Sequence, residues 1–335
     1  MFQRIASWTL VAAVAAGCSH AAPPPPPMPS AGGPSWPVAP ARLTLAPTAT
    51  LDPALVPPLP HTRMEAHAQG FAIPESVIHD PEQDIYFVSN INGRNADRDN
   101  NGFLSRMRPD GTVETREWVA GGRNGVTLNA PKGMAIVGDT LWVADIDAVR
   151  GFDRRTGAAL ATIDLRAQGA VFLNDLAEGP DGVYATDTGT RYDERGVPIP
   201  DGGRIYRLAG GAASVVTADP LMQGPNGIAY DRRNRRMIVV SYGGTRILSL
   251  QNGVVRQVAT GPGQFDGVAV LDDGTILVSS QATSAIHRYD DDGDGGAKAI
   301  DNIMGVGDIS VDARRGRLLL ARLNQNRVEA HLLPR

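Results

Sequence analysis

Short apolar runs, each preceded by a polar residue, recur along most of the chain. The clearest copy spans residues 224–231, in which Asn226 is followed by a glycine, an apolar run and an acidic turn. A second apolar run follows the turn, and short apolar runs separated by turn residues predict β-strands. The polar residues that begin the copies are Glu75, Lys132, Asn174, Asn226, Asp266 and Asp308.

The spacing of these copies predicts a repeat architecture. Successive starting residues are 57, 42, 52, 40 and 42 residues apart, close to the roughly 40–50 residues of a four-stranded propeller blade. Six copies therefore predict an all-β fold, a six-bladed β-propeller of four-stranded blades over residues 61–335. Because the innermost strand of each blade lines the central channel, the six polar side chains are expected to converge on one axis.

Four further features refine this prediction. The sixth repeat has sequence for only two strands after its inner strand, so residues 62–71 are expected to supply its outer strand and close the ring. The insertion 188–203 is expected to overhang one end of the channel. Two acidic loops, 92–102 and 290–296, resemble half of a calcium loop but lack its glutamate, so solvated hairpin loops are favoured. His79 and His287 are expected to face solvent.

The first 60 residues differ from the repeats. Residues 1–18 carry Arg4, an apolar run and small residues before Cys18, a pattern similar to that of a bacterial lipoprotein signal peptide. Lipidation of Cys18 would place the protein in the cell envelope, at the outer membrane facing the periplasm; the alternative is ordinary secretion with cleavage nearby. Residues 19–60 are rich in proline and alanine and are expected to form an extended, disordered tether.

Composition limits the classes of partner. The formal net charge is -4, and this mildly acidic balance gives no reason to expect nucleic acid as a partner, because proteins that bind nucleic acid carry clustered positive charge. The only contact expected with a membrane is through the lipid anchor, and the sequence identifies no protein partner. The sequence contains no Gly-x-Ser-x-Gly elbow, His-Glu-x-x-His motif or phosphate-binding loop, so serine hydrolase, zincin and nucleotide-driven functions are unsupported.

Four of the converging residues have the chemistry of a cation site. Glu75, Asn174, Asn226 and Asp266 would bring two carboxylates and two amide oxygens to one end of the channel. Hard oxygen ligands without His or Cys favour Ca²⁺ over softer metals. The alternative is that these positions are polar only because a propeller channel faces water.

The residues around these four positions carry a family resemblance. Ile73-Pro74-Glu75-Ser76, Leu173-Asn174-Asp175, Pro225-Asn226-Gly227 and Phe265-Asp266-Gly267 resemble the signature positions of the senescence marker protein, gluconolactonase and luciferin-regenerating enzyme family of six-bladed propellers. The resemblance covers roughly residues 64–335. It implies a catalytic divalent metal at these four positions, usually Ca²⁺ with Zn²⁺ or Mn²⁺ also used. It also implies that Asp266 serves as base or nucleophile, in a family whose members hydrolyse sugar lactones and whose related propellers hydrolyse phosphoester-type compounds.

Other residues near the predicted site have more than one interpretation. Lys132 is a candidate positive group for a substrate oxygen, or a partner for a carboxylate such as Asp308. Asp175 is expected to support Asn174 or a strand end. The family's substrate-contacting Arg has no counterpart near Asn174, where Val171 and Phe172 stand. The resemblance therefore supports a sugar substrate less strongly than it supports the metal site.

Two functions follow from these observations. The first is a metal-dependent hydrolase acting on a small-molecule lactone or ester. The second is an envelope-tethered propeller that binds a ligand or protein and uses the metal only structurally, since one fold hosts both. A quinone-dependent dehydrogenase propeller lacks a visible cofactor signature.

Overall fold

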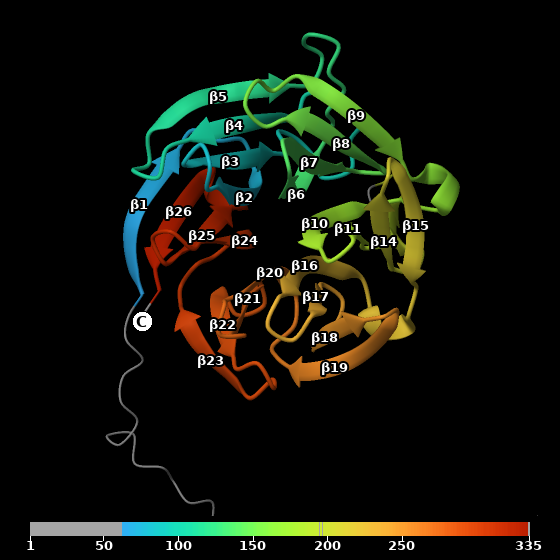
Figure 1. Cartoon of the computed structure of the whole chain (residues 1–335), viewed down its shortest axis with the longest axis vertical. Helices are drawn as coiled ribbons and strands as arrows, with labels where there is room; N and C mark the ends of the chain where they lie inside the picture. Colours follow the sequence, from blue (N-terminus) through green and yellow to red (C-terminus); the bar gives the residue numbers. More distant parts are fainter. Residues whose placement is uncertain (1–61, 194, 196, 334–335) are drawn as a thin grey trace, which may run out of the picture. The chain divides into compact units, whose positions relative to one another are not determined.

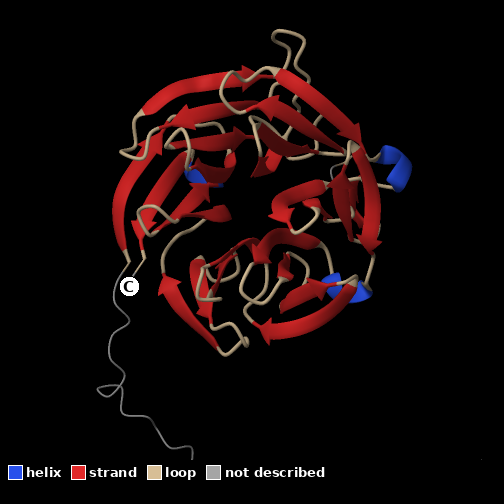
Figure 2. Ribbon diagram, viewed as in Figure 1, coloured by secondary structure: helices blue, strands red, loops and turns tan. Residues whose placement is uncertain are grey.

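The computed structural model describes residues 62–193, 195 and 197–333. The predicted signal segment 1–18 with Cys18, and the whole of the tether 19–60, lie outside these residues, so both remain predictions. The regular secondary structure of the described chain consists of β-strands and three short 3₁₀ helices (Figure 2). None of its helices is long and apolar enough to cross a membrane.

Six four-stranded antiparallel sheets make up the described fold, as predicted. Blade 1 contains β2 (Pro74–Asp80), β3 (Ile85–Asn90), β4 (Phe103–Met107) and β5 (Val113–Ala120). Blade 2 contains β6 (Pro131–Val137), β7 (Thr140–Asp145), β8 (Ala148–Asp153) and β9 (Ala159–Asp164). Blade 3 contains β10 (Leu173–Gly179), β11 (Gly182–Asp187), β14 (Arg204–Ala209) and β15 (Ala212–Thr217).

The remaining blades follow the same plan. Blade 4 contains β16 (Pro225–Asp231), β17 (Arg236–Ser241), β18 (Arg246–Gln251) and β19 (Val254–Thr260). Blade 5 contains β20 (Phe265–Val270), β21 (Ile276–Ser280), β22 (Ala285–Tyr289) and β23 (Gly295–Ile300). Blade 6 contains β24 (Val306–Asp312), β25 (Arg317–Arg322), β26 (Arg327–Leu332) and β1 (Arg63–Gln69).

A small hairpin and three 3₁₀ turns lie outside the blades. The hairpin pairs β12 (Thr190–Tyr192) with β13 (Pro198–Pro200) within the insertion of blade 3. The 3₁₀ turns are η1 (Arg166–Gln168), η2 (Pro220–Met222) and η3 (Leu323–Gln325).

The first and last strands of the propeller close the ring. Figure 1 shows β1, in blue, beside the red β26, and the two strands pair antiparallel from Arg63↔Leu332 to Gln69↔Arg327. This confirms the expectation that the segment before the first repeat supplies the outer strand of the sixth blade. Closure pairs backbone groups that an open edge would leave free.

The hydrophobic core is divided among the interfaces between blades. One cluster joins Phe87 and Leu104 of blade 1 to Leu141 and Phe152 of blade 2, and five equivalent clusters fill the other interfaces. Alternate residues of each strand thus pack against the preceding and following blades, which explains the nearly continuous apolar runs in the sequence.

The inner strands approach one another very closely around the channel. A Cβ on Gly133 would lie 2.2 Å from Oδ1 of Asp175, and a Cβ on Gly267 would lie 2.4 Å from the backbone nitrogen of Ile309. A Cβ on Gly227 would lie 2.5 Å from the carbonyl oxygen of Asp266. Glycine is therefore required at these three positions because of the close approach of a neighbouring strand.

Both histidines expected to face solvent are instead largely enclosed. The ring of His79 lies between Asp84 and Asp312, with nitrogen–oxygen distances of 3.2 and 3.3 Å. His287 is buried, and its ring nitrogens are 2.8 Å from Oγ1 of Thr283 and 2.9 Å from the carbonyl oxygen of Gly296. The expectation was wrong because ring partners supplied by other turns and strands satisfy the polar atoms of both residues.

Gly267→Ala should reduce the free energy of unfolding by about 1–3 kcal/mol, because the added methyl group overpacks the contact between β20 and β24. Urea denaturation followed by fluorescence measures the change. Gly93→Ala is the matched control, since its Cβ would meet nothing closer than Oδ2 of Asp99 at 3.2 Å. Equal stability of the two variants would show that strand spacing is not the constraint inferred here.

Candidate active site

Each inner strand presents its second residue at the same end of the channel, which we call the channel mouth. The first residue of each inner strand pairs with the second strand, and a bulge then displaces the next two residues from the ladder. A bulge of this kind redirects side chains beside functional sites. The second residues are Glu75, Lys132, Asn174, Asn226, Asp266 and Gly307.

The sixth equivalent position is therefore Gly307 and not Asp308, which corrects the repeat alignment by one residue. Val306 pairs with Arg322 just as Pro74 pairs with Asn90. Asp308 consequently belongs with Asp175 and the three close-packed glycines, one residue deeper in the channel. A shift of one residue along a strand changes the face on which a side chain lies.

Glu75, Asn226 and Asp266 lie together at the mouth. All three are buried, and Asn226 and Gln281 both hydrogen-bond to the carboxylate of Asp266. Burial raises the pKa of Asp266 to about 6, and these hydrogen bonds limit the rise. Burial, followed by repulsion from Asp266 and Asp308, raises the pKa of Glu75 well above its usual range.

Oε2 of Glu75 is the most informative atom of the site. It is buried, and no donor in the described part of the chain reaches it. A buried carboxylate oxygen without a partner is costly, and native structures rarely retain one without a function.

Asn174 joins this group through blade 3. Its Nδ2 donates to Oγ1 of Thr188 at 3.1 Å, and Thr188 in turn donates to the carbonyl oxygen of Pro225 at 2.9 Å. The amide nitrogen is thereby fixed to Thr188, which leaves Oδ1 of Asn174 as the free end of the amide. The four residues predicted to form one oxygen-rich site thus occupy equivalent positions on the inner strands of blades 1, 3, 4 and 5.

Lys132 lies at the same mouth, with only 2% of its surface exposed. Nζ donates to the carbonyl oxygen of Ala130 at 3.0 Å and lies 4.5 Å from the centre of the Phe172 ring. Burial lowers the pKa of Lys132 to about 8, while the charges of Glu75 and Asp145 oppose the shift. Its electrostatic partners are therefore these two carboxylates, and the alternative pairing with Asp308 is not observed.

The last residue of each second strand anchors the loop that leads into the inner strand. Asp187, for example, accepts hydrogen bonds from the backbone N–H groups of Val171 and Phe172 at 3.1 and 2.9 Å. Equivalent side-chain bonds to the preceding loop are made in all six blades, by Asn90, Asp145, Asp187, Ser241, Ser280 and Arg322. These contacts fix the loop before each inner strand, and so they fix the position of the mouth residue near the start of that strand.

The next residue in each blade belongs to a second ring at the mouth, which the repeat pattern did not predict. Its members are Ile91, Ile146, Thr188, Tyr242, Gln281 and Leu323. Ile91 and Ile146 pack together with Ala130, whereas Thr188 and Gln281 bond to Asn174 and Asp266. The signal in the sequence was one polar residue directly after each second strand of blades 3–5.

Asp175 and Asp308 lie deeper and serve a different purpose. Asp175 accepts from the N–H groups of Leu176 and Ile228, and Asp308 accepts from Ile309 and from the hydroxyl of Ser76. Each carboxylate therefore links its own blade to the next one. This confirms a supporting role for Asp175, although its partner is a strand of blade 4 rather than Asn174. Burial raises the pKa of Asp308 to about 7.

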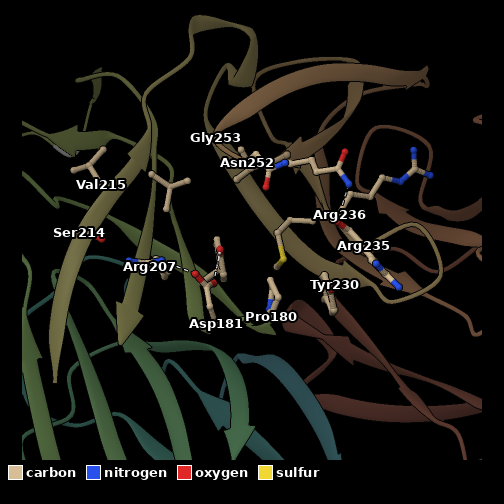
Figure 3. A pocket seen from close by; sticks show the side chains of 15 residues that line it. Pro180, Asp181, Arg207, Ser214, Val215, Tyr230, Arg235, Arg236, Asn252 and Gly253 are labelled. Atoms are coloured by element: carbon tan, nitrogen blue, oxygen red, sulfur yellow. Dashed lines mark hydrogen bonds and ion pairs between the residues drawn. The ribbon is translucent and has the colours of Figure 1, made fainter. Parts of the chain in front are cut away.

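A separate hollow of about 340 Å³ lies between blades 3 and 4, at the end of the propeller opposite the channel mouth (Figure 3). The hairpin turns at Asp181 and Asn252 line it. Figure 3 shows Arg207 directed toward Asp181, with which it pairs, and Arg236 is paired with Asp231. These charges already have partners, and none of the mouth residues reaches this hollow.

The acidic loops also lack a metal-binding arrangement. Within the residues that the structure describes, no group of three or more His, Cys, Asp and Glu could hold a metal ion. In the first loop, Asp99 accepts a hydrogen bond from the side chain of Asn101 at 2.7 Å. Arg98 forms a bidentate ion pair with Asp147 of blade 2. The interpretation as hairpin loops is therefore favoured for residues 92–102.

Comparison with known proteins agrees with this architecture. A putatively assigned gluconolactonase solved by structural genomics is 18% identical, with a TM-score of 0.62, and the match covers 82% of this chain and 93% of that one. A gluconolactonase from Xanthomonas campestris is 18% identical, with a TM-score of 0.60 and coverage of 83% and 99%. Virginiamycin B lyase from Staphylococcus aureus is 12% identical, with a TM-score of 0.54 and coverage of 78% and 95%.

These likenesses establish the propeller fold. No protein of curated function matches the chain. The model of the SMP-30/gluconolactonase/LRE-like region, however, matches residues 73–299, which include Glu75, Lys132, Asn174, Asn226 and Asp266. The match covers more than half of the chain and every residue of the candidate site, so the protein belongs to the SMP-30/gluconolactonase/LRE-like family.

Proposed function

We propose that the protein is a metal-dependent hydrolase of a lactone or a related ester, with its site at the channel mouth. The observation that carries the proposal is the unpartnered, buried Oε2 of Glu75 beside the carboxylate of Asp266. Two buried carboxylates that repel each other are unfavourable unless a cation compensates them.

The residues at the mouth fit a divalent cation. Glu75, Asn174, Asn226 and Asp266 would hold it with carboxylate and amide oxygens, a set that favours Ca²⁺ and accommodates Mn²⁺ or Zn²⁺ less well. Binding would displace protons from the carboxylates whose pKa values are raised. The bound cation would supply Lewis-acid polarisation of the substrate carbonyl and stabilise negative charge on its oxygen.

Asp266 is the proposed general base. A pKa of about 6 leaves its carboxylate mainly ionised at neutral pH and still able to accept a proton. Gln281 and Asn226 hold the carboxylate in place. Asp266 would take a proton from water as the oxygen of that water attacks the carbonyl carbon, and would return it to the ring oxygen when the ester bond breaks.

Lys132 is the proposed positive group for a substrate oxygen. A lysine has three N–H donors, and one hydrogen bond, to Ala130, is found within the described chain. With a pKa of about 8, the ammonium group is mainly charged at neutral pH. The Phe172 ring and the charge of Glu75 hold it at the mouth.

We also propose that Cys18 is lipidated and tethers the propeller in the cell envelope. The support is the run of small residues before Cys18 and the proline-rich segment that follows it. Cys18→Ser should move the protein from the membrane fraction to the soluble fraction while leaving its melting temperature unchanged. Mass spectrometry of the wild type should find an acylated N-terminal cysteine; an unmodified one would contradict the assignment.

Glu75→Gln should weaken metal binding, because it removes a charge and one of two carboxylate ligands. In the chelated wild type, Ca²⁺ at a hundredfold excess over Kd should stabilise the fold by about 2.7 kcal/mol. The variant should lose most of this gain in the same calorimetric titration. Glu178→Gln, at the far end of β10 and half exposed, is the matched control. An unchanged Ca²⁺ response in Glu75→Gln would remove this site.

Asp266→Asn distinguishes an enzyme from a binding propeller with a structural metal. With the metal site refilled, turnover of a lactone should fall by about 10² to 10⁴, the usual contribution of a positioned general base, with little change in substrate binding. Asp272→Asn, in an exposed turn of the same blade, controls for the substitution. Wild-type turnover in a metal-loaded Asp266→Asn protein would show that Asp266 is a ligand and not a base.

A further inference from the structure

A cavity of about 540 Å³ opens beside the site, between blades 3 and 4. Its walls are the β12–β13 hairpin, residues 218–220 and the turn that follows β17. In each blade the inner strand begins at the channel mouth, and the strands then alternate in direction. The second and fourth strands, which include β11, β15 and β17, therefore end at the mouth. The cavity therefore lies at the same end of the propeller as Glu75 and Asp266.

Two residues connect the cavity to the candidate active site. Thr188 lines the cavity and hydrogen-bonds to Asn174. Tyr242 also lines it, and the pKa of its phenol is raised by burial and then by the nearby charge of Asp266. A group attached to a molecule bound at the mouth can therefore extend into the cavity.

One face of the β12–β13 hairpin lines the cavity. Thr190 and Pro200 are register partners and line the cavity. Tyr192 lies two residues further along the same face, and its ring is 6.0 Å from that of Phe172, which in turn contacts Lys132. Arg191 belongs to the other face, where it pairs with Asp201.

The two charged side chains of the cavity, Arg204 and Asp219, are hydrogen-bonded to backbone groups of the protein. Arg204 donates to the carbonyl oxygens of Gly169 and Gly202, and Asp219 accepts from the N–H of Leu221. Much of the remaining lining is glycine, proline, alanine and tyrosine. Although Thr190, Gln223 and Tyr242 add polar atoms, the surface that the lining exposes to the cavity is mainly apolar. Such a surface favours an apolar ligand, because a buried hydroxyl without a partner is unfavourable.

We propose that this cavity is the specificity pocket, and that it takes an uncharged alkyl substituent of the substrate. The preferred substrate is then a lactone or ester with an apolar tail rather than a polyhydroxylated sugar lactone. This inference rests on the proposed function, since it assigns a substrate class to the same site.

Hydrolysis of a tail-length series tests the pocket. The series runs from δ-valerolactone, without a tail, through δ-hexalactone and δ-octalactone to δ-decalactone, with D-glucono-δ-lactone as the sugar comparison. The kcat/KM of the wild type should rise about fourfold for each buried methylene until the tail fills the pocket, and should be lowest for the sugar lactone. A flat series, or a preference for the sugar lactone, overturns the proposal.

Two variants fill the cavity from opposite walls. Thr190→Trp and Ala218→Trp should each abolish the dependence on tail length. Because the two substitutions lie on different walls, the test remains valid if one of the variants misfolds. Thr115→Trp, at an exposed position of the outer strand β5, is the matched control and should retain the full dependence. Retention of the dependence in both cavity variants contradicts the assignment of the pocket.

A binding measurement separates failure of the pocket from failure of the proposed function. Calorimetry compares cyclopentanone with 2-pentylcyclopentanone, which cannot be hydrolysed. If the wild type hydrolyses none of the lactones but binds the alkyl ketone more tightly, and Thr190→Trp loses that gain, the pocket stands and the hydrolase proposal fails. Equal binding of the two ketones by the wild type overturns the pocket.

Discussion

The close approach of the six inner strands is the constraint on which the rest of the structure depends. At the third residue of these strands a neighbouring backbone occupies the space of a Cβ, so Gly133, Gly227 and Gly267 have no substitute without movement of a strand. Asp175 and Asp308 stand at equivalent positions on opposite blades and bond to the blade that follows. The same contacts bring the second residues of the strands together at the mouth, so the packing that closes the channel also assembles the candidate site.

Bringing these residues together requires the protein to bury charge. A carboxylate removed from water is stabilised only by hydrogen bonds or by opposite charge. Asp266 has the first kind of support, from Gln281 and Asn226, whereas Oε2 of Glu75 has no hydrogen bond from the described chain. Lys132 supplies one positive charge, which leaves the two carboxylates incompletely neutralised. This imbalance, more than the presence of acidic residues, is what supports a cation at the mouth.

The repeat pattern predicted more of the fold than of the site. The spacing of apolar runs gave six blades, the closing strand and the four oxygen-bearing residues, because each depends on local periodicity. Register depends on pairing between strands, so Asp308 was placed one residue away from its true equivalents. The burial of His79 and His287 and the contact of Gln281 with Asp266 depend on partners brought together by tertiary structure. No local pattern contains that information.

The ring that follows the second strands divides the mouth into unlike halves. Blades 1, 2 and 6 contribute Ile91, Ile146 and Leu323, and blades 3–5 contribute Thr188, Tyr242 and Gln281. Glu75 belongs to the apolar half and Asp266 to the polar half, so their environments move their pKa values apart. Two carboxylates in unlike environments can take different roles. Asp266, held by donors and ionised near neutral pH, suits proton transfer as well as metal binding, whereas Glu75, without such donors, suits metal binding alone. The division into halves thus supports the proposed role of Asp266 as the acid–base group without recourse to the family resemblance.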